Sequence, residues 1–259
     1  MPTLVLTGGS GGIGQATARL FASRGWQVFE LSRSGTNQQG IVHIACDVTS
    51  RQAVFAAIEQ VMQQTDRIDV ALSNAGMGIS GPVEFTGEEA MHRQMDVNFF
   101  GAVYFVQAVL PVLRQQRDSC ILFTSSVAGV LSVPYQSFYS ATKAALNALA
   151  LALQNEVRPF GIRVSCLLPG DVATGFTGAR NKDEQGYAVY ERAHKAIEAM
   201  EKDEQGGMKP EKMARLLWRM AHKKSPAPFY VGGFLYRIFC FLDRILPKRV
   251  VNRIEGMMY

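Results

Sequence analysis

The stretch Thr3-Leu-Val-Leu-Thr-Gly-Gly-Ser-Gly-Gly-Ile-Gly14 decides the fold of this chain. Its first five residues are apolar or β-branched, which is typical of a short buried strand, and a glycine-rich turn follows at once. Residues 13–24 then carry apolar side chains at helical spacing. A strand, a glycine turn and a helix in this order are the context in which a dinucleotide fingerprint forms.

The glycines of this turn fit two known spacings. Gly9, Gly11 and Gly14 match G-x-G-x-x-G, whereas Gly8, Gly12 and Gly14 match G-x-x-x-G-x-G after a threonine. Either arrangement lets the backbone approach a pyrophosphate, to which the first amides of the helix donate hydrogen bonds. A flexible turn without a ligand is the alternative. The predicted nucleotide contacts are Gly8, Ser10, Gly12, Ile13 and Gly14.

Strand-like and helix-like segments alternate along the rest of the chain. The predicted strands are 3–7, 27–32, 43–45, 68–72, 120–124, 162–167 and 229–231, and the main helices are 13–24, 53–62, 88–113, 136–157 and 210–222. This alternation predicts an α/β fold, a Rossmann-like doubly wound parallel sheet of about seven strands with helices on both faces. Ligands bind such sheets at the carboxyl ends of the strands.

The end of the second predicted strand bears on which nucleotide binds. An acid there would bond the adenosine ribose of NAD, but this chain has Ser32 and Arg33. An arginine can hold a 2′-phosphate that an acid would repel. We therefore expect NADP(H) in preference to NAD(H), unless Arg33 is only a solvated loop charge. Glu30, the nearest acid, lies two residues back within the strand.

Tyr139 and Lys143 are four residues apart in a predicted helix and so share one face. A free tyrosine titrates near pH ~10, and a fixed positive charge beside it favours the phenolate. We expect Lys143 to lower the pKa of Tyr139, so that the phenol works as an acid or base. Ser126 stands thirteen residues before Tyr139. Its hydroxyl can donate a hydrogen bond to the substrate oxygen to which Tyr139 gives its proton. The side chain of Ser125 should point the other way.

These motifs together resemble the short-chain dehydrogenase/reductase family over roughly residues 3–175, and further toward 231. The matching residues are the Thr7–Gly14 turn, Asp47-Val48, Asn74-Ala75-Gly76, Asn98, Ser126, Tyr139, Lys143 and Pro169-Gly170 with Thr174. Two positions depart from the family pattern. Ser73 stands where an asparagine is commoner, and Asp171 stands where an apolar residue is frequent and would make the nicotinamide end more polar.

The resemblance implies hydride transfer between a nicotinamide and a carbonyl or secondary alcohol. It implies a catalytic set of Asn98, Ser126, Tyr139 and Lys143, in which Tyr139 donates the proton and Asn98 holds a water in a proton relay. The cofactor contacts that it implies, beside the glycine turn and Ser32-Arg33, are Asp47 and Val48 at the adenine, Asn74, Ala75 and Gly76 at the adenine ribose, Tyr139 and Lys143 at the nicotinamide ribose, and Pro169, Gly170, Val172 and Thr174 at the nicotinamide.

Composition and charge exclude several other classes. With 47% hydrophobic and 19% charged residues, the 259-residue chain is not disordered. Its net charge of +5 is spread along the chain without a clustered basic face, so we expect no nucleic-acid partner. Four separated cysteines and four histidines show no metal-ligand spacing, which predicts no metal site and a reducing compartment. The chain enters a strand without a signal-like segment, so we expect a cytoplasmic protein.

Two segments stand apart from the alternating pattern. Residues 173–208 are polar and glycine-containing, and are interpreted as a lid over the site, with a helix near 187–200, or as a plain surface excursion. Residues 232–259 are apolar but interrupted by Arg237, Asp243 and Arg244, too often to span a bilayer. This tail can line the substrate pocket, form a subunit contact or touch a membrane surface.

The sequence therefore predicts a single domain, 1–259, that acts as an NADP(H)-dependent oxidoreductase. An apolar tail beside a lid predicts a lipophilic substrate, such as a steroid, a retinoid or a long-chain ketone. The alternatives are a cofactor-binding sensor or scaffold without turnover, and epimerase or dehydratase chemistry on the same fold. We expect a homodimer or homotetramer, paired through the long helices 88–113 and 136–157.

Overall fold

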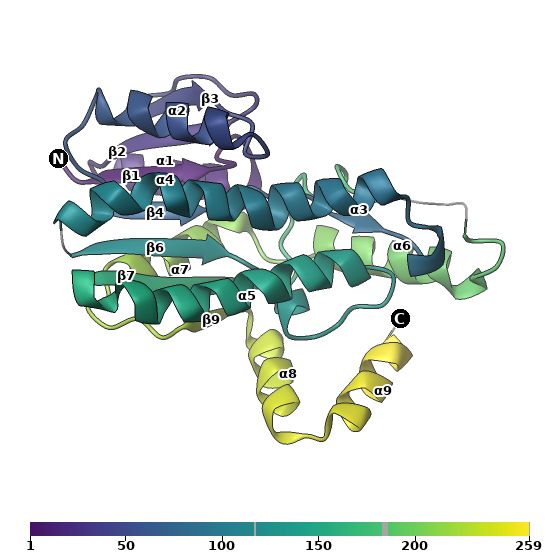
Figure 1. The fold of residues 1–259 in the computed structure, drawn as a ribbon. Coiled ribbons are helices and arrows are strands. Elements are labelled where there is room, and N and C mark those ends of the chain that lie inside the picture. The colour runs from purple at the N-terminus through teal and green to yellow at the C-terminus, as the bar shows by residue number, and fades with distance from the viewer. Residues whose placement is uncertain (117, 183–185, 259) are drawn as a thin grey trace.

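In the computed structural model, which describes residues 1–116, 118–182 and 186–258, seven strands form one parallel sheet (Figure 1). The strands are β1 Thr3–Thr7, β2 Gln27–Ser32, β3 Ile41–Ala45, β4 Val70–Ser73, β6 Ser119–Thr124, β7 Ile162–Pro169 and β9 Phe229–Gly232. Their order in the sheet is β3-β2-β1-β4-β6-β7-β9. The chain therefore builds outward from β1 in one direction and then in the other, which confirms the doubly wound parallel sheet.

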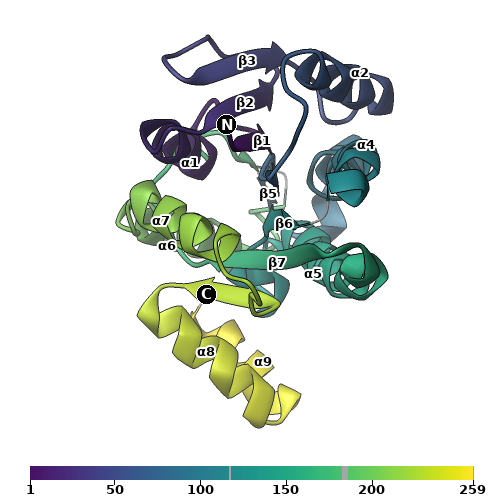
Figure 2. The ribbon, with the colours of Figure 1, turned by 90° about the vertical axis from the view of Figure 1, so that its left-hand side faces the viewer.

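Helices cover both faces of this sheet, as Figure 2 shows. Helices α1 Gly12–Ser23 and α7 Pro210–Ala221 pack together on one face. The other face carries α2 Arg51–Met62, α4 Gly101–Gln116 and α5 Ser137–Val157. Because both faces are covered, the strands are apolar on both sides, as expected for a parallel sheet.

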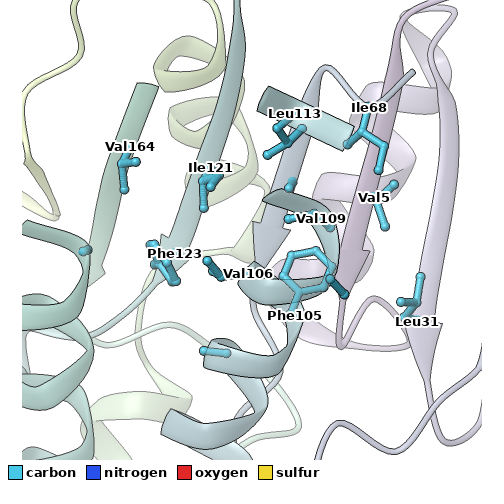
Figure 3. Packing of buried hydrophobic residues seen from close by; sticks show 14 of the residues in the cluster. Val5, Leu31, Ile68, Phe105, Val106, Val109, Leu113, Ile121, Phe123 and Val164 are labelled. Carbon is cyan, nitrogen blue, oxygen red and sulfur yellow. The ribbon is translucent and has the colours of Figure 1, made fainter. Parts of the chain in front are cut away.

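The packing of α4 on the sheet forms the larger core (Figure 3). Phe105, Val109 and Leu113 are fully buried against strand residues such as Val5 and Ile121. Burying one side chain of this kind stabilises the fold by about 1.5–3 kcal/mol. By length and composition, Glu88–Gln116 is also one helical stretch of the described residues that could cross a membrane. Its buried face shows the packing of a core helix.

The predicted helix 88–113 is not one regular helix. It consists of α3 Glu88–Met95, a wider π-helical turn at Asp96–Phe100 and then α4. Such single π turns are frequent at functional sites. Shorter turns of 3-10 helix lie at Val83–Phe85, Val127–Gly129 and Arg158–Phe160.

Two further features lie outside the seven-stranded sheet. Strand β5 Ile79–Ser80 pairs with β8 Asn181–Lys182, and helix α6 Glu191–Gln205 follows, several residues later than the helix predicted at 187–200. After β9, α8 Phe234–Ile245 and α9 Lys248–Met258 form a helical hairpin. Figures 1 and 2 show this hairpin projecting away from the sheet below β9.

Candidate active site

One cavity of about 1510 Å³ follows the carboxyl ends of the strands. It brings together most of the predicted site residues, namely Gly8, Ser10, Gly12, Ile13, Ser32, Arg33, Asp47, Val48, Asn74, Ala75, Gly76, Ser126, Tyr139, Lys143, Pro169, Gly170, Val172 and Thr174. Gly14 and Asn98 do not line it. Both residues lie behind the cavity wall, where Gly14 packs against Gly8 and Asn98 bonds Met77.

The glycine turn follows the second of the two predicted spacings. Gly8 and Gly12 have φ angles of +67° and +51°, which a residue with a side chain adopts only under strain. A Cβ on Gly14 would lie 2.2 Å from the carbonyl oxygen of Gly8, so α1 could not approach β1 this closely. Gly11, by contrast, has open space where a Cβ would be. The backbone therefore requires Gly8, Gly12 and Gly14.

The N-terminus of α1 is free to take an anion. Its N-cap is Gly11, which makes no side-chain cap, and the first turn contains no acidic residue. Ser10, Gly11, Gly12 and Ile13 line the cavity here. Uncapped amides and the positive end of the helix dipole suit a pyrophosphate. This end of the cavity fits a dinucleotide.

The turn after β4 is tied to the glycine turn by hydrogen bonds. The Asn74 side-chain amide donates to the Gly8 carbonyl at 3.0 Å and to the Thr7 carbonyl at 3.2 Å. The Thr7 hydroxyl oxygen accepts from the backbone amides of Asn74 and Ala75, each at 3.0 Å. The side chain of Asn74 therefore holds two loops together, and Ala75 and Gly76 are left to face the cavity.

The far end of the cavity combines one carboxylate with two cations. Asp47 accepts hydrogen bonds from the backbone amide and hydroxyl of Thr49, and the first of these is the main cause that lowers its pKa. The charges of Arg33 and Arg93 lower the pKa of Asp47 further. Arg93 also lines the cavity, but sequence reasoning missed it because it lies in α3 without any motif around it.

Tyr139 and Lys143 both face the cavity from α5, in surroundings of low polarity. Burial raises the pKa of the Tyr139 phenol to about 12, and a hydrogen bond with Ser126 opposes this rise. Burial lowers the pKa of the Lys143 ammonium to about 8. The expected lowering of the Tyr139 pKa by Lys143 is therefore wrong for this structure. The Lys143 Nζ donates to the Thr124 carbonyl at 2.9 Å and lies 5.6 Å from the centre of the Tyr139 ring.

The two serines after β6 point in different directions, as expected. The Ser125 hydroxyl is buried and donates to the Lys143 carbonyl at 3.2 Å. The Ser126 oxygen accepts from the Ala128 amide at 3.0 Å and faces the cavity. The same hydroxyl makes the hydrogen bond with Tyr139 described above.

Asn98 lies in the π-helical turn and is only 1% exposed. Its Oδ1 accepts from the Met77 amide at 2.8 Å. Its Nδ2 donates to the Met77 carbonyl at 2.9 Å and to the Thr142 hydroxyl at 3.1 Å. Asn98 thus joins the loop after β4 to α5 directly behind the catalytic side chains. Its role in a water relay stays a prediction.

Described residues of the segment 173–208 lie next to Tyr139 and border the cavity. The ring of Phe176 lies 5.7 Å from that of Tyr139. Arg180, which is buried, pairs with Glu204 of α6, and the Thr177 hydroxyl donates to the same carboxylate at 2.6 Å. The function of this segment as a lid stays a prediction. No motif around these residues could have revealed the pairing, because the partners are more than twenty residues apart.

The tail closes the other side of the cavity. Tyr236 of α8 donates a hydrogen bond to the carboxylate of Asp171, whose pKa is raised chiefly by burial. Its ring lies so close to Gly170 that a Cβ there would be 2.0 Å from Cδ2. Asp171 thus binds the tail, rather than simply making the nicotinamide end more polar. The inner faces of α8 and α9 line the cavity with Phe239, Leu242, Leu246, Val251 and Ile254.

Among the cysteines and histidines, Cys46 and His92 line this cavity. Cys46, Cys120, Cys166 and Cys240 are unpaired and buried. Within the described part of the chain, no three His, Cys, Asp or Glu side chains gather as a metal site would require.

A nucleotide-shaped cleft above a doubly wound sheet, with Ser126, Tyr139 and Lys143 at its centre, defines the class as dinucleotide-dependent oxidoreductases. Residues 2–185 match the family model of the short chain dehydrogenases. The chain belongs to this family, and it is an oxidoreductase that acts on carbonyl or alcohol groups.

Individual relatives extend the likeness into the tail. A 3-ketodihydrosphingosine reductase of Bacteroides thetaiotaomicron is 39% identical over 262 residues, which cover 99% of this chain and 97% of that protein. A short-chain dehydrogenase from Streptomyces avermitilis has a solved structure with a TM-score of 0.83 and 26% identity, covering 99% of this chain and 96% of the other.

Solved relatives also define the kind of cofactor. An alcohol dehydrogenase from Thermococcus sibiricus holds 5-hydroxy-NADP, with a TM-score of 0.73 and 26% identity, covering 89% of this chain and 95% of the other. Other structures with this fold hold NADH or NAD. A nicotinamide dinucleotide is thus the cofactor of the family.

Proposed function

We propose that this protein is an NADP(H)-dependent reductase of a long-chain keto lipid, of the 3-ketodihydrosphingosine kind. The main support for this proposal is the cavity, which extends from Ser126 and Tyr139 to apolar side chains on the inner faces of α8 and α9. A long chain can lie along these helices while its keto group reaches Tyr139. The relative that shares both the catalytic domain and the tail is named as a reductase of such a substrate.

The residues present fit the cofactor from end to end. The uncapped start of α1 would hold the pyrophosphate, and Asp47 and Val48, which line the cavity, would border the adenine. Arg33, with Arg93 near it, supplies the positive charge for a 2′-phosphate. Lys143 would hold the nicotinamide ribose, and Val172 and Thr174, which line the cavity, would border the nicotinamide. When bound, the reduced nicotinamide supplies the hydride.

Tyr139 acts as the proton donor in the direction of reduction. With its pKa near 12, the phenol keeps its proton at neutral pH until negative charge develops on the substrate oxygen. The Ser126 hydroxyl donates to the same oxygen and stabilises that charge. Lys143 sits beside them with a pKa of about 8, and Asn98 holds the Met77 loop that backs the relay.

A reductase assay tests this function directly. Purified protein is given NADPH with 3-ketodihydrosphingosine, with a ketosteroid, with retinal and with a small polar ketone, and the loss of NADPH absorbance is followed. We expect the long-chain ketone to have the highest kcat/KM. Turnover of the small polar ketone alone would overturn the lipid substrate. NADPH binding without any turnover would indicate a sensor or scaffold instead.

A charge variant tests the choice of cofactor. A hydrogen bond to a charged group contributes about 1.5–3 kcal/mol, so Arg33→Ala should weaken NADPH binding by roughly 10–100-fold and leave NADH binding nearly unchanged. Arg24→Ala, another exposed arginine outside the cavity, serves as the control. Equal losses for both nucleotides would refute the role of Arg33.

The proposal includes a cytoplasmic location and a homodimer or homotetramer. Unpaired, separated cysteines support a reducing compartment. Helices α4 and α5 lie side by side on one face of the sheet and are the surfaces proposed to pair. Light scattering with the purified protein measures the subunit number.

A further inference from the structure

The hairpin of α8 and α9 carries an unusual share of the exposed apolar surface. Fifteen large apolar side chains are exposed among the described residues, and eight of them lie in these two helices. Figures 1 and 2 show the hairpin standing clear of the rest of the molecule. An exposed apolar surface this concentrated marks an interaction site.

The exposed residues of α8 form a stripe along one side. Phe234, Ile238, Phe241 and Ile245 follow helical spacing and are 39–74% exposed. The opposite side of α8 carries Tyr236, which reaches Asp171 in the cavity wall. The helix thus has two apolar sides, one against the protein and one without cover in the described structure.

Helix α9 continues the same arrangement. Val250 and Met257 are 43% and 76% exposed and lie outside the cavity lining. Ile254, which is 46% exposed, borders the cavity as well, and Val251 is buried and lines the cavity. The cavity that leads to Tyr139 therefore lies directly behind the exposed apolar side of the hairpin.

The charges of the hairpin are sorted by sign. All five of its cations are exposed, and these are Arg237, Arg244, Lys248, Arg249 and Arg253. Its two acids are turned inward.

Asp243 and Glu255 both line the cavity, and burial is the main cause that raises the pKa of Glu255. Lys248 pairs with Asp243 at 2.5 Å. The outer surface of the hairpin is therefore apolar and positively charged at once.

We infer that the outer face of α8 and α9 docks on the surface of a bilayer that contains anionic lipids. Exposed Phe, Ile, Val and Met side chains enter the acyl-chain boundary, and the arginines contact the phosphate groups. A second copy of the chain fits less well, because a two-fold contact through this face would set the exposed arginines of one copy against those of the other. The docked hairpin opens the cavity toward the membrane in which the substrate dissolves, and this last point rests on the proposed lipid substrate.

Vesicle flotation tests the docking. The full chain is mixed with vesicles of phosphatidylcholine, with or without phosphatidylglycerol, and centrifuged in a density gradient. We expect flotation with the mixed vesicles, weaker flotation with phosphatidylcholine alone, and a loss on adding salt. Absence of flotation with the mixed vesicles would overturn the proposal.

Two sets of variants locate the contact. Arg244→Gln, Arg249→Gln and Arg253→Gln together should lower the partition coefficient on the order of 100-fold, since each cation near an anionic surface contributes about fivefold. Phe241→Ser with Ile245→Ser should cause a loss of about 100-fold by removing buried apolar area. None of these five side chains lines the cavity.

Matched controls come from other surfaces of the chain. Val83→Ser with Val189→Ser removes two side chains that are 56% and 67% exposed, close to the 60% of Phe241 and Ile245. Arg19→Gln, Lys209→Gln and Lys212→Gln remove three exposed charges from α1 and the α7 region. Equal losses of flotation in these controls would overturn the assignment to the hairpin. It would also be overturned if the hairpin variants bound vesicles normally but had a different subunit number, measured by light scattering.

Activity separates this inference from the proposed function. The hairpin variants should keep the NADPH-dependent reduction of a water-soluble, short-chain ketone analogue and lose the reduction of vesicle-borne substrate. Flotation without ketone reduction would defeat the proposed function alone. Ketone reduction without flotation would defeat the docking alone.

Discussion

At the scale of single residues, burial decides the chemistry of the site more than pairing does. Tyr139 and Lys143 share a helix face, yet the surroundings move each of them toward its neutral form. In a medium of low polarity a charged phenolate and a charged ammonium are both costly. The protein therefore presents a protonated tyrosine, which is the form needed to reduce a carbonyl.

Replacing Tyr139 by phenylalanine should remove the proton donor and keep the shape of the cavity. We expect Tyr139→Phe to lower kcat at least ~10²-fold, the usual size of a general-acid contribution. NADPH binding, followed by fluorescence, should be unchanged. Near-normal kcat in this variant would show that another group supplies the proton.

The buried Lys143 should make stability depend on pH. Its pKa is about 8 in the folded protein and 10.5 in an exposed lysine, so the unfolded chain binds more protons between these values. The unfolding free energy therefore rises as pH increases from about 8 to 10.5. Below pH 8 the buried ammonium lowers the unfolding free energy by its full amount, about 3 kcal/mol.

Lys143→Met should remove this cost. Below pH 8 we expect the variant to have a higher unfolding free energy than the parent, by a few kcal/mol. The lost hydrogen bond to the Thr124 carbonyl reduces this gain, and the gain should shrink toward pH 10.5. Urea unfolding of both proteins across this pH range measures the difference in unfolding free energy. The titrations of Tyr139 and Cys166 largely cancel in this difference, because both proteins contain these residues. A difference that does not vary with pH would contradict the buried charge.

At the scale of elements, the π-helical turn at Asp96–Phe100 is what brings Asn98 to the site. The wider turn places its side chain against the Met77 backbone and against Thr142 of α5. A regular helix over 88–113 has no reason in its hydrophobic pattern to widen here. The Asn98 side chain accepts from the Met77 amide, and it shares the Met77 carbonyl with Gln94, whose side chain donates at 3.0 Å.

Asn98→Ala should therefore cost stability as well as turnover. It leaves the Met77 amide without this partner in a buried place, while the Met77 carbonyl keeps the Gln94 side chain at 3.0 Å, so we expect a loss of about 2 kcal/mol in unfolding free energy. Asn147→Ala, which removes one bond to the Gly129 carbonyl, is the matched control and should lose about 1 kcal/mol. Equal losses would mean that the Met77 loop finds other partners.

At the scale of the whole molecule, one cavity joins parts of the chain that are far apart in sequence. Its walls come from the sheet ends, from the segment with Phe176 and from the tail with Tyr236. Both the segment with Phe176 and the tail with Tyr236 therefore contribute to the walls around Tyr139.

The buried cysteines offer a probe of this assembly. Burial is the main cause that raises the pKa of Cys46 and Cys240 to about 11 and of Cys120 and Cys166 to about 12. At pH 8 we expect almost no reaction of the folded protein with Ellman's reagent, because the thiolate is the reactive form. All four thiols should become reactive at the denaturant concentration that changes tryptophan fluorescence. Earlier reaction of Cys240 alone would show that the tail detaches before the rest unfolds.

Much of this molecule follows from local patterns. The strand, glycine turn and helix at 3–24 and the later alternation determined the doubly wound sheet, because apolar periodicity reports which element a segment forms. The same logic placed Ser126, Tyr139 and Lys143 at the ends of strands or on one helix face, where they indeed share a cavity.

Only the tertiary structure decided the rest. It selected Gly8, Gly12 and Gly14 through the close approach of α1 to β1, reversed the expected pKa of Tyr139 and revealed the pairs Arg180–Glu204 and Tyr236–Asp171. These properties depend on contacts between residues distant along the chain, and on how much water those contacts exclude. The sequence by itself determined the elements and the reacting groups, whereas folding determined their polarity, their cover and the path by which a substrate reaches them.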